Sequence, residues 1–143
     1  MIASVSLEAW RATHQLVLAV FDATSRFPIE ERFGLRTQLR GAAVSLAAHV
    51  ARASSHRTQR HDHASARRGW AVVAQLGVLL QQARQRRLLD QAVWHALEDH
   101  RRAAARHVWR LPWRPPLPAG RTVPRADGQG RWALDVRTPA TTP

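Results

Sequence analysis

Apolar residues recur at helical spacing along four separate stretches of the chain. Helices are predicted over residues 7–26, 35–53, 59–87 and 91–110. Pro28 separates the first pair and Pro112 ends the last helix, because proline lacks an N–H and excludes helix for the residue before it. Ser6 and Asp90 are suitable N-caps for the first and fourth helices. The pattern predicts an all-α, antiparallel up-down-up-down four-helix bundle over residues 1–110.

One apolar stripe on each helix is assigned to the core by its spacing. In the first helix the stripe is Trp10, His14, Val17, Phe21 and Thr24. In the second it is Leu35, Leu39, Ala42, Ala43, Leu46, Ala47 and Val50. In the third it is Ala66, Trp70, Val73, Gly77 and Leu80, and in the fourth Val93, Leu97, His100, Ala104 and Val108. Leu18 and Val20 lie outside the first stripe and either widen the core or contact a second subunit. Phe27 and Phe33 are expected to close one end of the bundle.

The positive charge is concentrated in the middle of the chain. The net charge is +12, and all 22 basic residues are arginine. Residues 36–87 carry ten arginines against a single acid, Asp62, for a net charge of +9. Arginine in place of lysine is typical of a GC-rich genome, but that bias does not explain the scarcity of acids. Such a charge is typical of proteins that bind polyanions.

The segment from Phe27 to Ala53 resembles the signature of a bacterial four-helix bundle family, the proteins encoded in intervening sequences of 23S rRNA genes. That family is similar in turn to the accessory variability determinant (Avd) proteins of diversity-generating retroelements. The matching positions are Phe27, Pro28, Glu30, Glu31, Arg32, Phe33, Gly34, Leu35, Gln38, Leu39, Arg40, Ala42, Ala43 and Ser45. The chain departs from the family at Gly41, His49, Arg52 and Ala53. The resemblance implies a homo-oligomer, a pentameric ring with a basic surface or pore, and a reverse transcriptase as a possible partner.

Arginines that recur on helix faces form the predicted nucleic-acid site. A guanidinium donates two hydrogen bonds to one phosphate, and each neutralised phosphate releases counterions. Arg32, Arg36 and Arg40 share one stripe of the second helix. The predicted contacts to RNA or DNA are Arg36, Arg40, Arg57, Arg60, Arg67, Arg68, Arg102, Arg106 and Arg110. The alternative is a solvated surface with pairs inside helices, such as Glu98 with Arg102.

Residues 111–143 form a tail rich in Pro, Gly and Arg, which is expected to be extended or disordered. Within it, residues 131–137 alternate briefly, which allows a strand formed on a partner, and the alternative is an unstructured tail. Aromatic and arginine side chains meet at the junction with the bundle and in the tail. The predicted partner-binding residues are Trp109, Trp113, Arg114 and Trp132. Such clusters suit a protein partner or stacked bases, and the alternative is a tail that folds back over the bundle. Trp10, Trp70 and Trp94 are assigned to the core.

Several classes of function have little support in the sequence. There is no cysteine, and no apolar run approaches the length of a membrane span. His49, His56, His61 and His63 lack the i, i+4 spacing of a helical metal pair and are expected to add positive charge at lower pH. No cofactor, metal or catalytic residue is predicted, and a cytoplasmic location follows by default.

Two hypotheses follow from the sequence. The first is a non-catalytic nucleic-acid-binding accessory protein that holds RNA or DNA through its phosphates and presents it to a protein such as a reverse transcriptase. The second is a protein-interaction scaffold, in which the ring and the tail recruit a partner protein.

Overall fold

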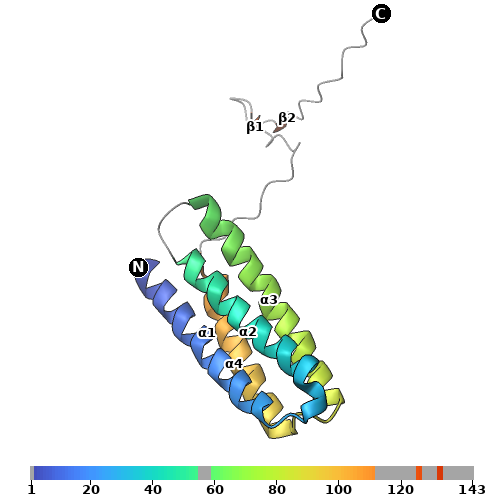
Figure 1. Ribbon diagram of the computed structural model, residues 1–143. Helices are drawn as coiled ribbons and strands as arrows, with labels where there is room; N and C mark the ends of the chain where they lie inside the picture. Colours follow the sequence, from blue (N-terminus) through green and yellow to red (C-terminus); the bar gives the residue numbers. More distant parts are fainter. Residues whose placement is uncertain (1, 55–58, 112–124, 127–131, 134–143) are drawn as a thin grey trace, which may run out of the picture.

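A computed structural model describes residues 2–54, 59–111, 125–126 and 132–133, and the main body is a bundle of four helices (Figure 1). The elements are α1 (Ile2–Ser25), η1 (a 3-10 helix, Ile29–Phe33), α2 (Leu35–Ala53), α3 (Gln59–Gln85) and α4 (Gln91–Trp109). Two short strands follow, β1 (Arg125–Ala126) and β2 (Trp132–Ala133), which pair antiparallel with Arg125 opposite Ala133. The predicted all-α, four-helix fold is confirmed.

Each helix packs against two neighbours, so that α1, α2, α3 and α4 close a ring in that order. In Figure 1 the sequence colours run along α1, return along α2 and repeat this course in α3 and α4. The α1–α2 and α3–α4 corners meet at one end, where Glu31 of η1 and Arg86 beyond α3 form an ion pair at 3.0 Å. No helix among the described residues combines the length and apolar character that a bilayer crossing requires.

Most predicted helix boundaries agree with the structure. The ends of α2 coincide with the predicted ones, and Asp90 caps α4 as expected, because its Oδ1 accepts a hydrogen bond from the Val93 N–H at 2.8 Å. The first helix differs, since α1 begins at Ile2 and Ser6 lies within it rather than at its cap. Within residues 131–137, where the sequence allowed a strand on a partner, the structure describes β2 (Trp132–Ala133), which pairs with β1 of the same chain.

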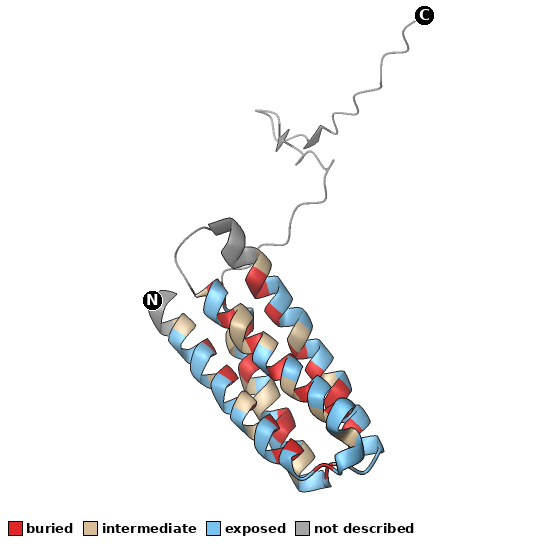
Figure 2. Cartoon of the chain, viewed as in Figure 1, coloured by how far each residue is buried: buried red, intermediate tan, exposed pale blue. Residues whose placement is uncertain are grey.

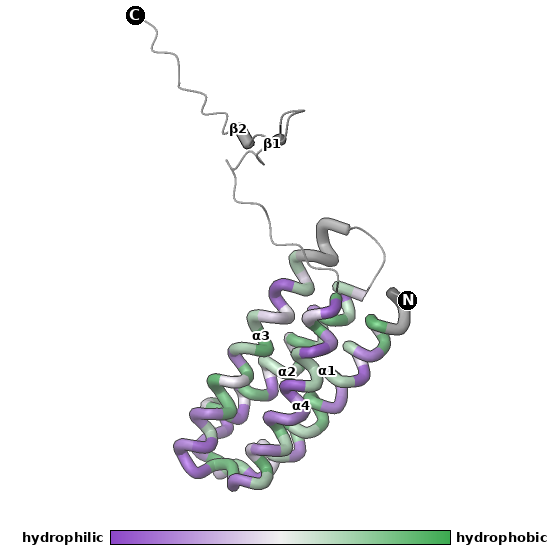
Figure 3. Tube along the Cα trace, turned by 180° about the vertical axis from the view of Figure 1, so that it is seen from behind, coloured by the Kyte–Doolittle hydropathy of each residue, from purple (hydrophilic) through white to green (hydrophobic). Residues whose placement is uncertain are grey.

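The core lies between the four helices, with buried positions on their inward sides and exposed, hydrophilic ones outside (Figures 2 and 3). The predicted stripe of α2 is confirmed except at Ala47, which is half-buried. In α4, Leu97, Ala104 and Val108 are buried as predicted, whereas Val93 and His100 are only partly buried. The largest fully buried side chains are Leu16, Leu39, Leu46, Leu76 and Leu80. Burial of these side chains supplies the main force that holds the bundle together.

The core stripe predicted for α1 is wrong. Of its members only Thr24 is buried, whereas Trp10, His14 and Phe21 are exposed and Val17 is half-buried. The helix instead buries a neighbouring stripe, made of Ala9, Thr13, Leu16, Val20 and Ala23. Both stripes have helical spacing, and the buried one has small residues, which allow closer approach of the adjacent helices. The outer stripe is left as an apolar surface.

Two other core assignments are also wrong. Trp70 is 41% exposed and Gly77 is half-buried, because α3 turns Leu76, Leu79 and Ala83 inward beside the predicted Ala66, Val73 and Leu80. Phe27 closes the end of the bundle as expected, but Phe33 is 86% exposed, since η1 buries none of its own residues. Trp94 is partly buried against the core.

Glu31 holds the corner between η1 and α2. Its Oε2 accepts a hydrogen bond from the N–H of Leu35, the first residue of α2, at 2.9 Å, and its Oε1 contacts Arg86. A carboxylate at this position satisfies an amide that the helix itself leaves without a partner. Gly34 makes the contact possible, because a Cβ at that residue would lie 2.5 Å from Glu31 Oε2.

We expect Gly34→Ala to lower the free energy of unfolding by about 1 kcal/mol, the usual cost of losing a helix cap. The new methyl group would displace the Glu31 carboxylate from the Leu35 amide. Gly41→Ala is the matched control, because nothing lies within 4 Å of a Cβ at Gly41. That change should instead stabilise α2 by up to about 1 kcal/mol, the difference in helix propensity. Urea denaturation measures both, and equal stabilisation by the two changes would contradict the role given to Gly34.

Candidate nucleic-acid interface

Four of the seven acidic side chains that the structure describes make structural contacts, and Asp22, Glu30 and Asp99 are exposed. Glu31 and Asp90 cap helices. Glu8 Oε2 lies 3.5 Å from His107 Nδ1, and the two form an ion pair only when His107 is protonated. Glu98 is 6% exposed. Because these carboxylates are already partnered, they do little to neutralise the arginines on the outer surface.

Glu98 forms the strongest of these contacts, a bidentate ion pair with Arg101. Its Oε1 and Oε2 accept hydrogen bonds from Arg101 Nε and Nη2, each at 2.8 Å, and Arg102 Nε lies 3.7 Å from Oε2. The hydrogen bonds from Arg101 hold the pKa of Glu98 below its ordinary value, against the opposing effect of burial. The guanidinium of Arg101 lies over Gly77, where a Cβ would be 3.2 Å from Arg101 Cζ. Gly77 therefore makes room for a charged side chain, not for a neighbouring backbone.

A pair of tryptophans lies on the outer side of α3 and α4. The rings of Trp70 and Trp109 have centroids 5.1 Å apart at an interplanar angle of 58°, and the two residues are 41% and 59% exposed. Arg67 precedes Trp70 by one turn, and Arg106 precedes Trp109 by one turn, so each arginine shares a side of its helix with a ring. The set formed by Arg67, Trp70, Arg102, Arg106 and Trp109 is called the Trp/Arg face.

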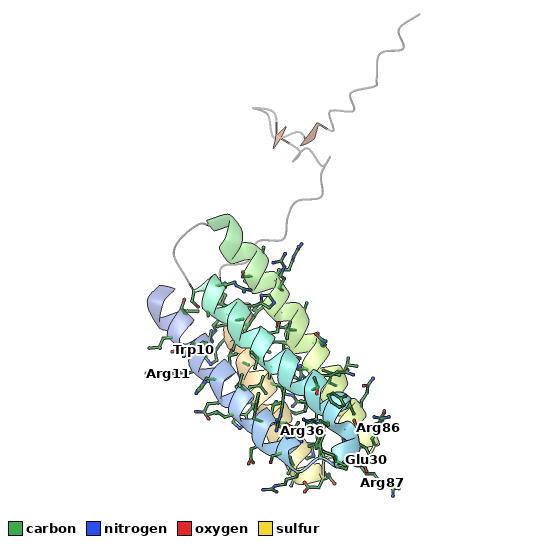
Figure 4. The ribbon with its side chains drawn as sticks, viewed as in Figure 1. Trp10, Arg11, Glu30, Arg36, Arg86 and Arg87 are labelled. Carbon is green, nitrogen blue, oxygen red and sulfur yellow. The ribbon has the colours of Figure 1, made fainter. Side chains whose placement is uncertain are left out.

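A second basic group surrounds an open hollow at the other end of the bundle. The hollow, about 440 Å³ in volume, lies where η1 meets the start of α2. We call it the basic hollow; it is lined by Ile29, Arg32, Phe33, Arg36, Thr37 and Arg40. Figure 4 shows Arg36 in this end of the bundle, towards Glu30, Arg86 and Arg87. The predicted stripe of Arg32, Arg36 and Arg40 is therefore found along one surface.

The predicted nucleic-acid residues do not form one continuous patch. Arg36 and Arg40 line the basic hollow, whereas Arg67, Arg102 and Arg106 belong to the Trp/Arg face. Arg110 is exposed at the end of α4, and Arg68 is exposed near His49 on the α2 side of α3. The side chains of Arg57 and Arg60 lie outside the described residues, as do Trp113, Arg114 and the side chain of Trp132.

Arg40 has a structural role as well. Its Nε donates a hydrogen bond to Thr24 Oγ1 at 2.8 Å, and its Nη2 donates to the Phe21 carbonyl at 3.2 Å. Its guanidinium carbon lies 4.7 Å from the centroid of the Phe21 ring. Arg36, Arg67, Arg68, Arg106 and Arg110, by contrast, form no ion pair with another described residue.

His49 does not fit the role predicted for the histidine cluster, which was to add positive charge at lower pH. Burial is the main cause that lowers its pKa, and the nearby charges of Arg52 and Arg68 lower it further. His49 therefore takes up a proton less readily than an exposed histidine, so it is a poor source of extra positive charge. The side chains of His56, His61 and His63 lie outside the described residues. Within the described part of the chain, no three His, Asp or Glu side chains are grouped to hold a metal ion.

The sequence did not identify Ile29, Phe33, Thr37 and Trp70 as residues of these surfaces. Trp70 and Phe33 were assigned to the core by their apolar character, although each lies among arginines on the surface. Arg101 was not distinguished from Arg102, since both are at helical distance from Glu98. The one available signal was the clustering of Arg32, Phe33 and Arg36 along the chain, because aromatic residues between arginines often mark binding surfaces.

Comparison with known proteins gives one positive result. No curated protein matches the chain. The model of the family described as 23S rRNA-intervening sequence protein matches residues 5–107, which reach from the first turns of α1 to the last turn of α4. By this match, and in agreement with its four-helix fold, the chain belongs to the 23S rRNA-intervening sequence protein family.

Proposed function

We propose that this protein is a non-catalytic accessory protein that binds RNA or DNA through its phosphates. The observation that carries the proposal is that acidic and basic side chains of the described chain differ in how many have a partner. Four of the seven described acids (Glu8, Glu31, Asp90 and Glu98) have structural contacts, whereas most of the described arginines, Arg36, Arg67, Arg68, Arg106 and Arg110 among them, have no described ionic partner. A surface of this kind attracts the phosphate backbone without reading its sequence.

The Trp/Arg face is the proposed principal interface. Arginines flank an exposed aromatic pair there, so phosphates and unpaired bases could be bound side by side. Its arginines come from two helices that pack against each other, which gives the face a fixed geometry. The similarity to Avd proteins makes a reverse transcriptase the candidate recipient of the bound nucleic acid, with a cytoplasmic location.

We also propose that the active form is a homo-oligomer, a pentamer by the same similarity. The support on this chain is a set of exposed apolar side chains on α1, together with one on α2. Leu7, Trp10, Leu18 and Phe21 are between 39% and 52% exposed, and Val44 on α2 is 50% exposed. Trp10 lies on the outer side of α1 (Figure 4) and stacks on His14, with ring centroids 5.9 Å apart. An exposed apolar surface of this kind is typical of protein interfaces.

The binding test uses a short fluorescein-labelled single-stranded RNA and measures anisotropy over a series of salt concentrations. We expect tight binding at low salt that weakens steeply as salt rises. The double variant Arg67→Gln/Arg106→Gln should reduce the slope of log K against log salt by about 1.4, two phosphate contacts on a single strand. The double variant Arg11→Gln/Arg26→Gln removes the same charge from α1 and the turn after it, and should leave most of the slope unchanged.

Either of two results would contradict nucleic-acid binding. One is the absence of binding to both RNA and DNA at low salt, and the other is equal loss of slope in the two double variants. A protein-interaction scaffold is the second candidate function, and the exposed Trp70–Trp109 pair favours it as well. In that case Trp109→Ala should abolish binding of the partner protein, and the binding by wild type should depend little on salt.

A further inference from the structure

The basic hollow differs in composition from the Trp/Arg face. Its two apolar residues, Ile29 and Phe33, are 67% and 86% exposed, and Phe33 is the most exposed large apolar residue of the described chain. A ring with so little burial contributes almost nothing to the stability of the bundle. The guanidinium carbon of Arg32 lies 5.5 Å from the centroid of this ring. The hollow therefore combines an accessible flat apolar surface with cations.

Arg40 is held in place at the side of the hollow. Its hydrogen bonds to Thr24 and to the Phe21 carbonyl use Nε and Nη2. A guanidinium has five N–H donors, so the Nη1 group is available to a ligand. Because the side chain is already ordered, binding through Arg40 costs less conformational entropy than binding through an unrestrained arginine.

The charge of the hollow favours an anion. Among the described residues, its lining includes three arginines and no acid. The nearby Glu31 is engaged by the Leu35 amide and Arg86, and the exposed Glu30 lies at the same end of the bundle, so the three arginines still outnumber the free carboxylates near the hollow. A volume of about 440 Å³ lies within the range of small-ligand sites, which is roughly 300–1,000 Å³.

We propose that the basic hollow binds one unpaired nucleotide of a single-stranded nucleic acid. The base stacks on Phe33, and Arg36 and Arg40 hold the phosphate. A nucleotide has both the flat ring and the negative charge that these side chains suit, whereas a base inside a duplex has no accessible face. The proposal rests on the proposed nucleic-acid-binding function and adds to it a preference for unpaired strands at this end of the bundle.

The test measures binding of adenosine 5′-monophosphate to the full-length protein by saturation-transfer-difference NMR. Saturation should reach the adenine H2 and H8 protons, and adenosine or inorganic phosphate alone should bind more weakly. Phe33→Leu should weaken binding roughly fivefold or more, as loss of a stacking aromatic does. Phe33→Tyr should keep the affinity, because the flat ring remains. Arg36→Gln should also weaken binding, whereas Arg11→Gln, an exposed arginine of α1 outside both surfaces, should not.

The outcomes separate this proposal from the broader one. If RNA binds with the expected salt dependence but the nucleotide does not bind, or binds Phe33→Leu equally well, the inference is wrong and the proposed function stands. If neither RNA nor DNA binds, the proposed function fails first. Binding of poly-glutamate to the hollow in place of the nucleotide would assign this surface to an acidic protein segment and overturn the proposal.

Discussion

Glu98→Gln is expected to lower the free energy of unfolding by about 2 kcal/mol, because it leaves the partly buried Arg101 without a charged partner. The melting temperature should fall by roughly 10 °C. The side chains of Glu98 and Arg101 are 8% and 21% exposed, so water cannot fully replace the lost pair. Thermal and urea unfolding, followed by circular dichroism at neutral pH, measure the change.

Two further variants show whether the pair itself is responsible. Arg102→Gln should lower the free energy of unfolding by less than about 1 kcal/mol. Arg102 is 65% exposed, and its 3.7 Å distance from the carboxylate is too long for a hydrogen bond. Glu98→Leu/Arg101→Met replaces both charges with apolar groups and should cost much less than Glu98→Gln alone. If the double variant lowers the free energy of unfolding by the sum of the losses in Glu98→Leu and Arg101→Met, the charges act separately and the prediction is wrong.

The effect of Glu98 should also depend on pH. Hydrogen bonds from Arg101 lower the pKa of the folded-state carboxyl below that of the unfolded chain. The unfolded state therefore binds the proton more readily, so the stabilisation is present above the unfolded pKa and is lost as the pH falls through the folded one. The difference between wild type and Glu98→Gln should narrow in acid.

Leu18→Glu is expected to convert the proposed oligomer to a monomer. Leu18 is 52% exposed on α1, outside the core, and a carboxylate buried there between subunits would lose its hydration without gaining a partner. Size-exclusion chromatography with light scattering should then give a mass near 16.1 kDa, where the wild type gives a multiple of it. The helical content should be unchanged, because Leu18 is not part of the core.

Val78→Glu is the matched control for Leu18→Glu. Val78 is a similarly exposed aliphatic residue, at 59%, but it lies on α3 rather than on α1. It introduces the same charge, so the oligomer should persist. A monomeric wild type would contradict the proposed homo-oligomer. If the oligomer persists in Leu18→Glu, the subunit interface does not include this part of α1.

The ease of predicting each helix depended on how many apolar stripes it carried. For α2 a single stripe satisfied the helical spacing, and its predicted ends and buried residues agree closely with the structure. For α1 two neighbouring stripes had the same spacing, and the choice of the one with larger rings was wrong. Spacing alone could not decide this, because the answer depends on how closely α2 and α4 approach.

The candidate site was only partly predictable for a related reason. The arginines could be found along the chain, but their partners depend on tertiary contacts. Arg40 reaches Thr24 on another helix, and Glu98 prefers Arg101 over Arg102 because Arg101 occupies the space above Gly77. The separation of the basic residues into a Trp/Arg face and a basic hollow follows from the packing of the helices, which the sequence pattern does not contain.

The contact between Glu31 and Gly34 places a shared constraint on two positions of the chain. A sequence that gains a side chain at position 34 loses the space that the carboxylate of residue 31 occupies, so selection on one position depends on the other. Drift at either position alone should be disfavoured, whereas joint replacement can be tolerated. Part of the segment by which the chain resembles its family is thus explained by the geometry of one helix terminus, without any ligand.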